Sequence, residues 1–240
     1  MVGYPNDADF MTSVDIVATA WAKVLELWIP FSDPGADGPL LTTLNHEMVA
    51  KGMTPAKALD LITQVKKKYP DIAICIMTYT NPIFHMGYDN FFAYMQQHKI
   101  ESFLMPEVPA QEFDTLGYKK EYADSVLIVS DNLTDEEIAQ VNEKTTGYLY
   151  VMSFVGTTGA KENYKQEVQA KLSAFVDRLR RICGPDKKLV IGFGIKSADD
   201  IAFLRTLPVD GFIIGSEIAK TIQNSGTTWL QTYVDGLWLA

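Results

Sequence analysis

Short apolar runs alternate with longer amphipathic segments along almost the whole chain. The apolar runs predict strands over 24–29, 72–79, 102–107, 125–130, 147–153, 188–194 and 211–216. The segments between them repeat apolar residues at helical spacing and predict helices over 11–20, 54–69, 88–98, 110–122, 134–145, 163–183, 197–206 and 217–224. Three of these helices have recognisable first residues in Thr54-Pro55, Thr134 and Ser197.

The strict alternation of strand and helix predicts a parallel sheet with crossover helices. No Pro-, Gly- or Ser-rich linker divides the sequence, so we expect a single domain over 1–240. An open doubly wound sheet is the alternative, but its glycine-rich first turn is absent, and Gly192-Phe193-Gly194 follows the sixth strand instead. Barrel enzymes often bind phosphate there. We therefore expect an α/β fold of the TIM-type (β/α)8 barrel class, with seven of its strands visible.

Composition excludes several classes of protein. The net charge of −9 disfavours nucleic acid as a partner, and no apolar run approaches the roughly 20 residues that cross a membrane. The two cysteines lie in or beside apolar runs, as free thiols of a cytoplasmic protein do (Cys75 and Cys183). The three histidines have no partner at a zinc-like spacing, so we expect no metal site (His46, His85 and His98).

A carboxylate inside the first visible strand is the first candidate for chemistry. Glu26 shares a strand face with Val24 and Trp28. Burying a lone carboxylate costs several kcal/mol unless it is paired or neutral. A buried salt bridge is one interpretation, and a functional acid or base with a raised pKa is the one we favour. Asp33 and Asp37 follow in a loop rich in Pro and Gly, where either an Asx turn or acid–base chemistry accounts for them.

Glycine and hydroxyl residues gather near the ends of the last predicted strands, at 156–159, 192–194 and 215–216. Glycine lets backbone N–H groups approach an anion, and a helix N-terminus adds its dipole. A tight turn accounts for any one of these segments alone. Because the carboxyl ends of barrel strands converge on one face, the three together predict a phosphate site.

The longest motif resembles a known family. Leu25-Glu26-Leu27, followed by 29–34 and 36–39, resembles the central motif of the tryptophan synthase α-subunit family. Further segments resemble that family in the same order, namely 77–82, 107–109, 153–159, 192–195 and 211–216. The resemblance extends from Gly3 to about Thr221.

This resemblance implies a cytoplasmic lyase of tryptophan biosynthesis that cleaves indole-3-glycerol phosphate to indole and glyceraldehyde 3-phosphate. The reaction is a retro-aldol cleavage without a cofactor in this chain. The expected partner is a β-subunit, which carries pyridoxal phosphate (PLP) and receives the indole. Glu26 would protonate the indole carbon that bears the side chain, Asp37 would hold the indole N–H, and Tyr150 would orient Glu26 or the substrate.

The same resemblance assigns residues to the phosphate end of the substrate. The phosphate is expected to contact Gly159, Phe193, Gly194, Gly215 and Ser216. Thr158 would position Asp37 when its loop closes.

Two departures from the family support a second hypothesis. The family has a helix and a first strand before Gly-Tyr-Pro, where this chain has Met1 and Val2, and a missing strand would leave edges that invite self-association. The family has Gly where this chain has Trp28, and usually at Trp21 as well; we expect Trp28 to point into the barrel and both tryptophans to fill space. The apolar tail 229–240 is expected to cover an edge or form an oligomer contact. The second hypothesis is therefore a truncated or engineered, catalytically impaired barrel scaffold.

Overall fold

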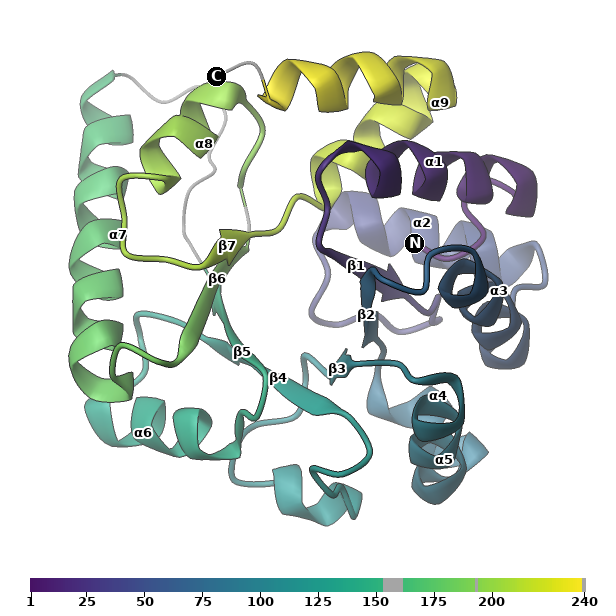
Figure 1. Ribbon diagram of the computed structural model, residues 1–240, viewed down its shortest axis with the longest axis horizontal. Helices are drawn as coiled ribbons and strands as arrows, with labels where there is room; N and C mark the ends of the chain where they lie inside the picture. Colours follow the sequence, from purple (N-terminus) through teal and green to yellow (C-terminus); the bar gives the residue numbers. More distant parts are fainter. Residues whose placement is uncertain (153–161, 193, 239–240) are drawn as a thin grey trace.

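The computed structural model describes residues 1–152, 162–192 and 194–238. Its sheet is parallel and strongly curled, and each strand pairs with the next one in the sequence (Figure 1). The strands are β1 (Val24–Trp28), β2 (Ala73–Met77), β3 (Ser102–Leu104), β4 (Asp124–Val129), β5 (Tyr148–Met152), β6 (Lys188–Gly192) and β7 (Gly211–Phe212). This arrangement confirms the predicted barrel class and the seven strands visible in the sequence.

Helices surround the sheet (Figure 1). They are α1 (Asp7–Ala20), α2 (Pro39–Ala50), α3 (Pro55–Lys68), α4 (Thr80–Met86), α5 (Tyr88–His98), α6 (Asp135–Lys144), α7 (Glu162–Cys183), α8 (Ala198–Leu204) and α9 (Ser216–Trp238), with a short 3-10 helix η1 (Phe113–Leu116). The three predicted starts are confirmed: the hydroxyls of Thr54, Thr134 and Ser197 each accept a backbone N–H of the first helical turn, and the last two form capping boxes.

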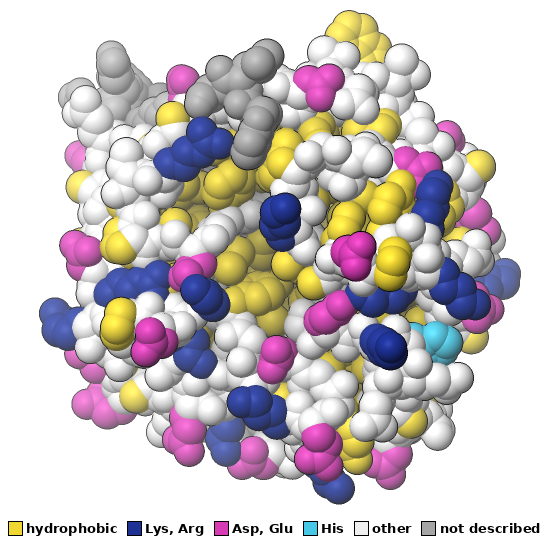
Figure 2. Space-filling view, in the orientation of Figure 1, with side chains coloured by type: hydrophobic (Ala, Val, Ile, Leu, Met, Phe, Trp, Pro, Cys, Tyr) yellow, Lys and Arg dark blue, Asp and Glu magenta, His cyan; other side chains and the backbone are white. Residues whose placement is uncertain are grey.

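The two faces of the sheet serve different purposes. On β1, Leu25 and Leu27 are buried against the helix layer, while Glu26 and Trp28 are half-buried on the opposite face. That opposite face encloses a second set of buried side chains, here called the interior cluster (Cys75, Met77, Tyr79, Leu104, Val126 and Tyr150). On the side of the molecule seen in Figure 2, hydrophobic side chains occupy the centre and charged ones surround them.

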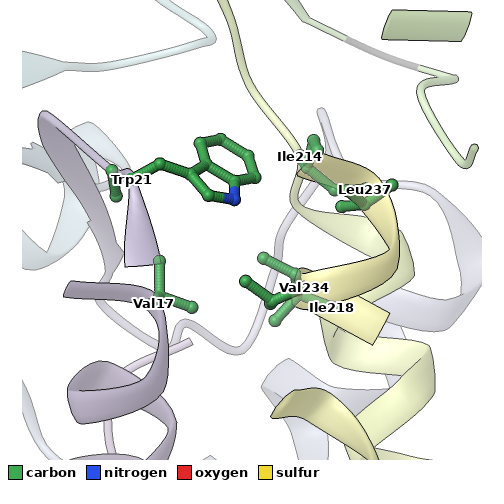
Figure 3. A pocket seen from close by; sticks show the side chains of 7 residues that line it. Val17, Trp21, Ile214, Ile218, Val234 and Leu237 are labelled. Carbon is green, nitrogen blue, oxygen red and sulfur yellow. The ribbon is translucent and has the colours of Figure 1, made fainter. Parts of the chain in front are cut away.

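The strands β1 and β7 are not neighbours in the sheet, and the line between them is here called the seam. Side chains bridge it: the rings of Trp21 and Phe212 lie 6.1 Å apart, centroid to centroid. The helices α1 and α9 lie side by side over the same region (Figure 1). Between them is a small apolar pocket (Figure 3), lined by Val17, Trp21, Ala22, Ile214, Ile218, Val234 and Leu237. Packing of apolar side chains, rather than pairing of strands, therefore joins the two edges of the sheet at the seam.

Two predicted helices need correction, and two further helices were not predicted. The helix predicted over 110–122 is wrong: only Phe113–Leu116 forms a 3-10 turn, which Gly117 ends with a positive φ of 65°. The helix predicted over 217–224 continues to Trp238 across a kink at Gly226, where φ is 72°. The helices α2 and α4 were not predicted, because α2 begins in a Pro-rich loop and α4 is only seven residues long with a proline inside it.

We expect Trp21→Ala to lower the free energy of unfolding by about 2–3 kcal/mol, because it removes the aromatic ring that spans the seam. Urea unfolding followed by circular dichroism measures this change. The matched control is Trp229→Ala on α9, whose side chain is 61% exposed and whose loss should change stability by less than about 0.5 kcal/mol. Equal effects of the two variants would show that Trp21 has no special role at the seam.

Candidate active site

Glu26 lies on the inner face of β1, in register with Cys75 on β2. Its Oε2 atom is inaccessible to solvent and has no hydrogen-bond partner among the residues that the structure describes. Burial raises the pKa of the Glu26 carboxyl to about 7, against the lowering effect of the positively charged Met1 amino group, and the neighbouring Asp37 carboxylate raises it further. A salt bridge, the alternative drawn from the sequence, is not among the ion pairs of the described residues. Glu26 is therefore a carboxyl that can gain or lose a proton near neutral pH.

Asp37 lies in the loop between β1 and α2, and the buried side chain of Asn45 holds it there. The Asn45 amide donates to Asp37 Oδ2 at 3.0 Å and to the Leu41 carbonyl at 2.9 Å, while its oxygen accepts the Phe31 N–H at 3.0 Å. Burial raises the pKa of Asp37 to about 6, against the opposing effect of hydrogen bonds from Tyr79 and Asn45. Asn45 was missed in the sequence because a single Asn in an unpredicted helix has no motif around it.

The loop separates the two aspartates that were candidates. The Asp33 side chain is exposed and accepts a hydrogen bond from the neighbouring Ser32 hydroxyl at 2.6 Å. Tyr79, at the end of β2, accepts the Ala36 N–H through its hydroxyl at 3.1 Å, which brings the loop over the interior cluster. Asp33 therefore has a local role in the loop, whereas Asp37 faces the same interior as Glu26.

Tyr150 lies on the inner face of β5 and belongs to the interior cluster. Burial raises the pKa of its hydroxyl, and the charge of Glu26 raises it further. Its ring packs directly on Gly192 of β6, where a Cβ atom would lie 2.1 Å from the ring. Any residue other than glycine at this position would displace the ring, so Gly192 sets the position of Tyr150. In the sequence, Gly192 was read only as part of a phosphate loop.

Three of the residues predicted for phosphate, Gly194, Gly215 and Ser216, follow β6 and β7, which are adjacent strands. Gly194 follows β6 with a φ of 79°. Gly215 and Ser216 follow β7, and Ser216 is the first residue of α9, where backbone N–H groups have no helical acceptor. The remaining predicted residues, Thr158, Gly159 and Phe193, lie outside the residues that the structure describes.

Other kinds of site find no support in the part of the chain that the structure describes. No three His, Cys, Asp or Glu side chains come together there as metal ligands do. Burial raises the pKa of the Cys75 thiol to about 12, which disfavours a thiolate nucleophile. Within residues 1–152, 162–192 and 194–238, no helix has the length and apolarity needed to span a membrane.

A curled parallel sheet with two raised-pKa carboxyls in and above its interior is characteristic of (β/α)-barrel enzymes. The sequence model described as tryptophan synthase alpha chain matches residues 1–234, and the chain belongs to that family. Membership supports a lyase function in tryptophan biosynthesis.

Relatives and solved structures agree with this assignment. A tryptophan synthase alpha chain from Francisella tularensis is 33% identical over 227 residues, covering 93% of this chain and 82% of that protein. One from Aquifex aeolicus is 31% identical over 222 residues, covering 92% and 82%. A structure of the tryptophan synthase α2β2 complex from Pyrococcus furiosus contains a chain with a TM-score of 0.86 and 27% identity, covering 100% of this chain and 95% of that one.

We expect Gly192→Ala to lower the free energy of unfolding by about 1–3 kcal/mol, because the added methyl group overlaps the Tyr150 ring. The same substitution in a Tyr150→Ala background should cost less than half as much. Urea unfolding of the four proteins of this double-mutant cycle measures the difference. An identical cost in both backgrounds would mean that the ring and Gly192 do not interact.

The raised pKa of Glu26 makes stability depend on pH in a defined direction. Between its ordinary value of 4.5 and about 7, the unfolded state has released a proton that the folded state retains, so this group makes stability fall as pH rises. We expect the free energy of unfolding to fall by about 2 kcal/mol less between pH 5 and pH 8 in Glu26→Gln than in the parent protein. Unfolding midpoints in urea across this range provide the measurement, and parallel curves for the two proteins would contradict the assignment.

Proposed function

We propose that this chain cleaves indole-3-glycerol phosphate into indole and glyceraldehyde 3-phosphate. The observation that carries the proposal is the Glu26 carboxyl, buried inside the barrel with a pKa near neutrality and beside a second carboxyl, Asp37. An acid–base group is most effective when its pKa lies near the working pH. Family membership supports the lyase class, and the roles of the individual residues are part of the proposal.

In the proposed reaction, protonated Glu26 delivers its proton to the ring carbon that bears the side chain. The ring becomes a cation, and Asp37 accepts a hydrogen bond from its N–H and stabilises the positive charge. The hydroxyl on the adjacent side-chain carbon then gives its proton to the Glu26 carboxylate, the carbon–carbon bond breaks, and the electron pair of that bond returns to the ring. The products are neutral indole and an aldehyde. Tyr150 would orient Glu26 or the substrate from across the interior.

The phosphate of the substrate would bind at the ends of β6 and β7. Gly194 and Gly215 can bring backbone N–H groups close to an anion, and Ser216 adds a hydroxyl at the N-terminus of α9. Phe193, Gly159 and Thr158 are proposed for the same end of the site on the strength of the family resemblance. This placement leaves the ring of the substrate at β1, where Glu26 lies.

The proposed chemistry uses only the protein's own acid and base groups. The proposed macromolecular partner is a tryptophan synthase β-subunit, which would hold PLP and receive the indole. Support comes from the Pyrococcus furiosus relative, whose structure is described as a tryptophan synthase α2β2 complex.

A second candidate is a barrel scaffold that has lost the lyase activity, possessing strand edges through which copies could associate. Trp28 favours it, because a large side chain occupies the inner face of β1 at the level above Glu26. The outer strands β1 and β7, which do not pair with each other, favour it as well.

Indole release from indole-3-glycerol phosphate, measured by chromatography with and without a β-subunit, distinguishes the two candidates. We expect Glu26→Gln to reduce kcat/KM by about 10²–10⁴-fold, because it removes the proton donor. The matched control is Asp33→Asn in the loop after β1, because the exposed Asp33 carboxylate should be dispensable for catalysis. No release from folded parent protein in either mixture would favour the scaffold.

A further inference from the structure

The inner face of β1 carries two large polar side chains in successive layers. Glu26 is in register with Cys75, and Trp28, two residues nearer the carboxyl end, is in register with Met77. The side chains of Leu25 and Leu27 point the other way, into the helix layer. Trp28 therefore lies in the layer directly beyond Glu26, on the side where the loop that carries Asp37 begins.

The indole of Trp28 contacts two groups of residues. It packs against the interior cluster, which includes Met77 and Tyr150. It also packs against a second buried cluster, which includes Leu44 of α2 and Ile222 of α9. The ring thus forms a wall of the interior near the seam, and this position agrees with the prediction that Trp28 points into the barrel.

Two buried polar atoms on this wall have no hydrogen-bond partner within the described part of the chain. They are Nε1 of Trp28 and Oε2 of Glu26, and both are inaccessible to solvent. Leaving a buried polar group unpaired costs about 1–3 kcal/mol. The indole N–H is a donor only, whereas a carboxylate accepts. A hydroxyl group satisfies both, since its oxygen accepts from Trp28 and its proton is donated to Glu26.

We infer that Trp28 is a substrate-contacting residue whose indole N–H donates a hydrogen bond to a hydroxyl oxygen of the substrate's three-carbon chain. The inference rests on the proposed function. The reacting ring carbon lies at Glu26 and the phosphate at the ends of β6 and β7, so the hydroxylated chain connects β1 with those strands. Trp28 borders the seam that separates β1 from β7 and faces this path.

The consequence is selectivity for a hydroxylated side chain. A site whose buried donor is left unpaired discriminates strongly against an analogue that lacks the matching oxygen. Indole-3-propanol phosphate has the same ring and phosphate as the proposed substrate but neither chain hydroxyl. It therefore isolates the hydroxyl contribution while the ring and phosphate contacts stay the same.

Calorimetric titration tests the inference in the Glu26→Gln protein, which should bind the substrate without cleaving it. We expect Trp28→Phe, which keeps a ring and removes the donor, to raise the Kd of indole-3-glycerol phosphate about tenfold. The Kd of indole-3-propanol phosphate should change less than twofold. The matched control is Trp21→Phe, which alters a tryptophan of the seam pocket instead and should leave both Kd values unchanged.

The inference would be overturned if Trp28→Phe changed the Kd of both ligands equally, or changed neither Kd. If neither ligand binds the Glu26→Gln protein and the parent releases no indole, the proposed function fails and the inference fails with it. If the parent releases indole but Trp28→Phe does not distinguish the ligands, only the inference fails.

A second measurement observes the Trp28 N–H directly in protein that retains Trp28. The chain has four tryptophans, so protein labelled with ¹⁵N in its indole rings gives a small set of N–H signals. We expect the Trp28 signal, identified by its absence from Trp28→Tyr or Trp28→Phe, to move downfield with indole-3-glycerol phosphate and not with the propanol analogue. Identical shifts with both ligands would again overturn the inference.

Discussion

The lack of pairing between β1 and β7 is the constraint on which the rest of this structure depends. A parallel sheet that curls but does not close leaves backbone donors and acceptors at its two outer strands, and these edges need cover. Here α1 and α9 pack over the seam, and Trp21 reaches Phe212 across it. The C-terminal segment belongs to this cover, since Leu230 and Val234 are buried against α2. Strand closure is thus replaced by the packing of helices and aromatic rings.

The same arrangement determines the electrostatics of the interior. Glu26, on an outer strand of the sheet, is enclosed by side chains from β2 to β5 and by Trp28 rather than by a further strand. Burial raises the pKa of Glu26 against the lowering effect of the Met1 amino group, and the pKa of Asp37, which Asn45 holds in place, is raised in the same way. An acid near neutrality is therefore a product of the packing around β1.

Periodicity was sufficient to predict the strands, because each is a short apolar run, and the inner position of Glu26 followed from strand alternation. The loop rich in Pro and Gly made Asp33 and Asp37 candidates, and the family resemblance then selected Asp37 and added Tyr150. Neither source could identify Asn45 or the contact between Tyr150 and Gly192, since both depend on how separate segments meet in space. The error over 110–122 has a different origin: its apolar residues, such as Phe113, are buried by a 3-10 turn and loop rather than by a helix.

Asn45 also determines when the entropy of the loop after β1 is lost. The side-chain amide of Asn45 on α2 accepts the Phe31 N–H and donates to the Asp37 carboxylate, and it also donates to the Leu41 carbonyl of its own helix. The loop therefore loses its conformational entropy when the protein folds and not when a ligand binds. A ligand that engages Asp37 meets an ordered carboxylate, so its binding free energy is not reduced by the ordering of a loop.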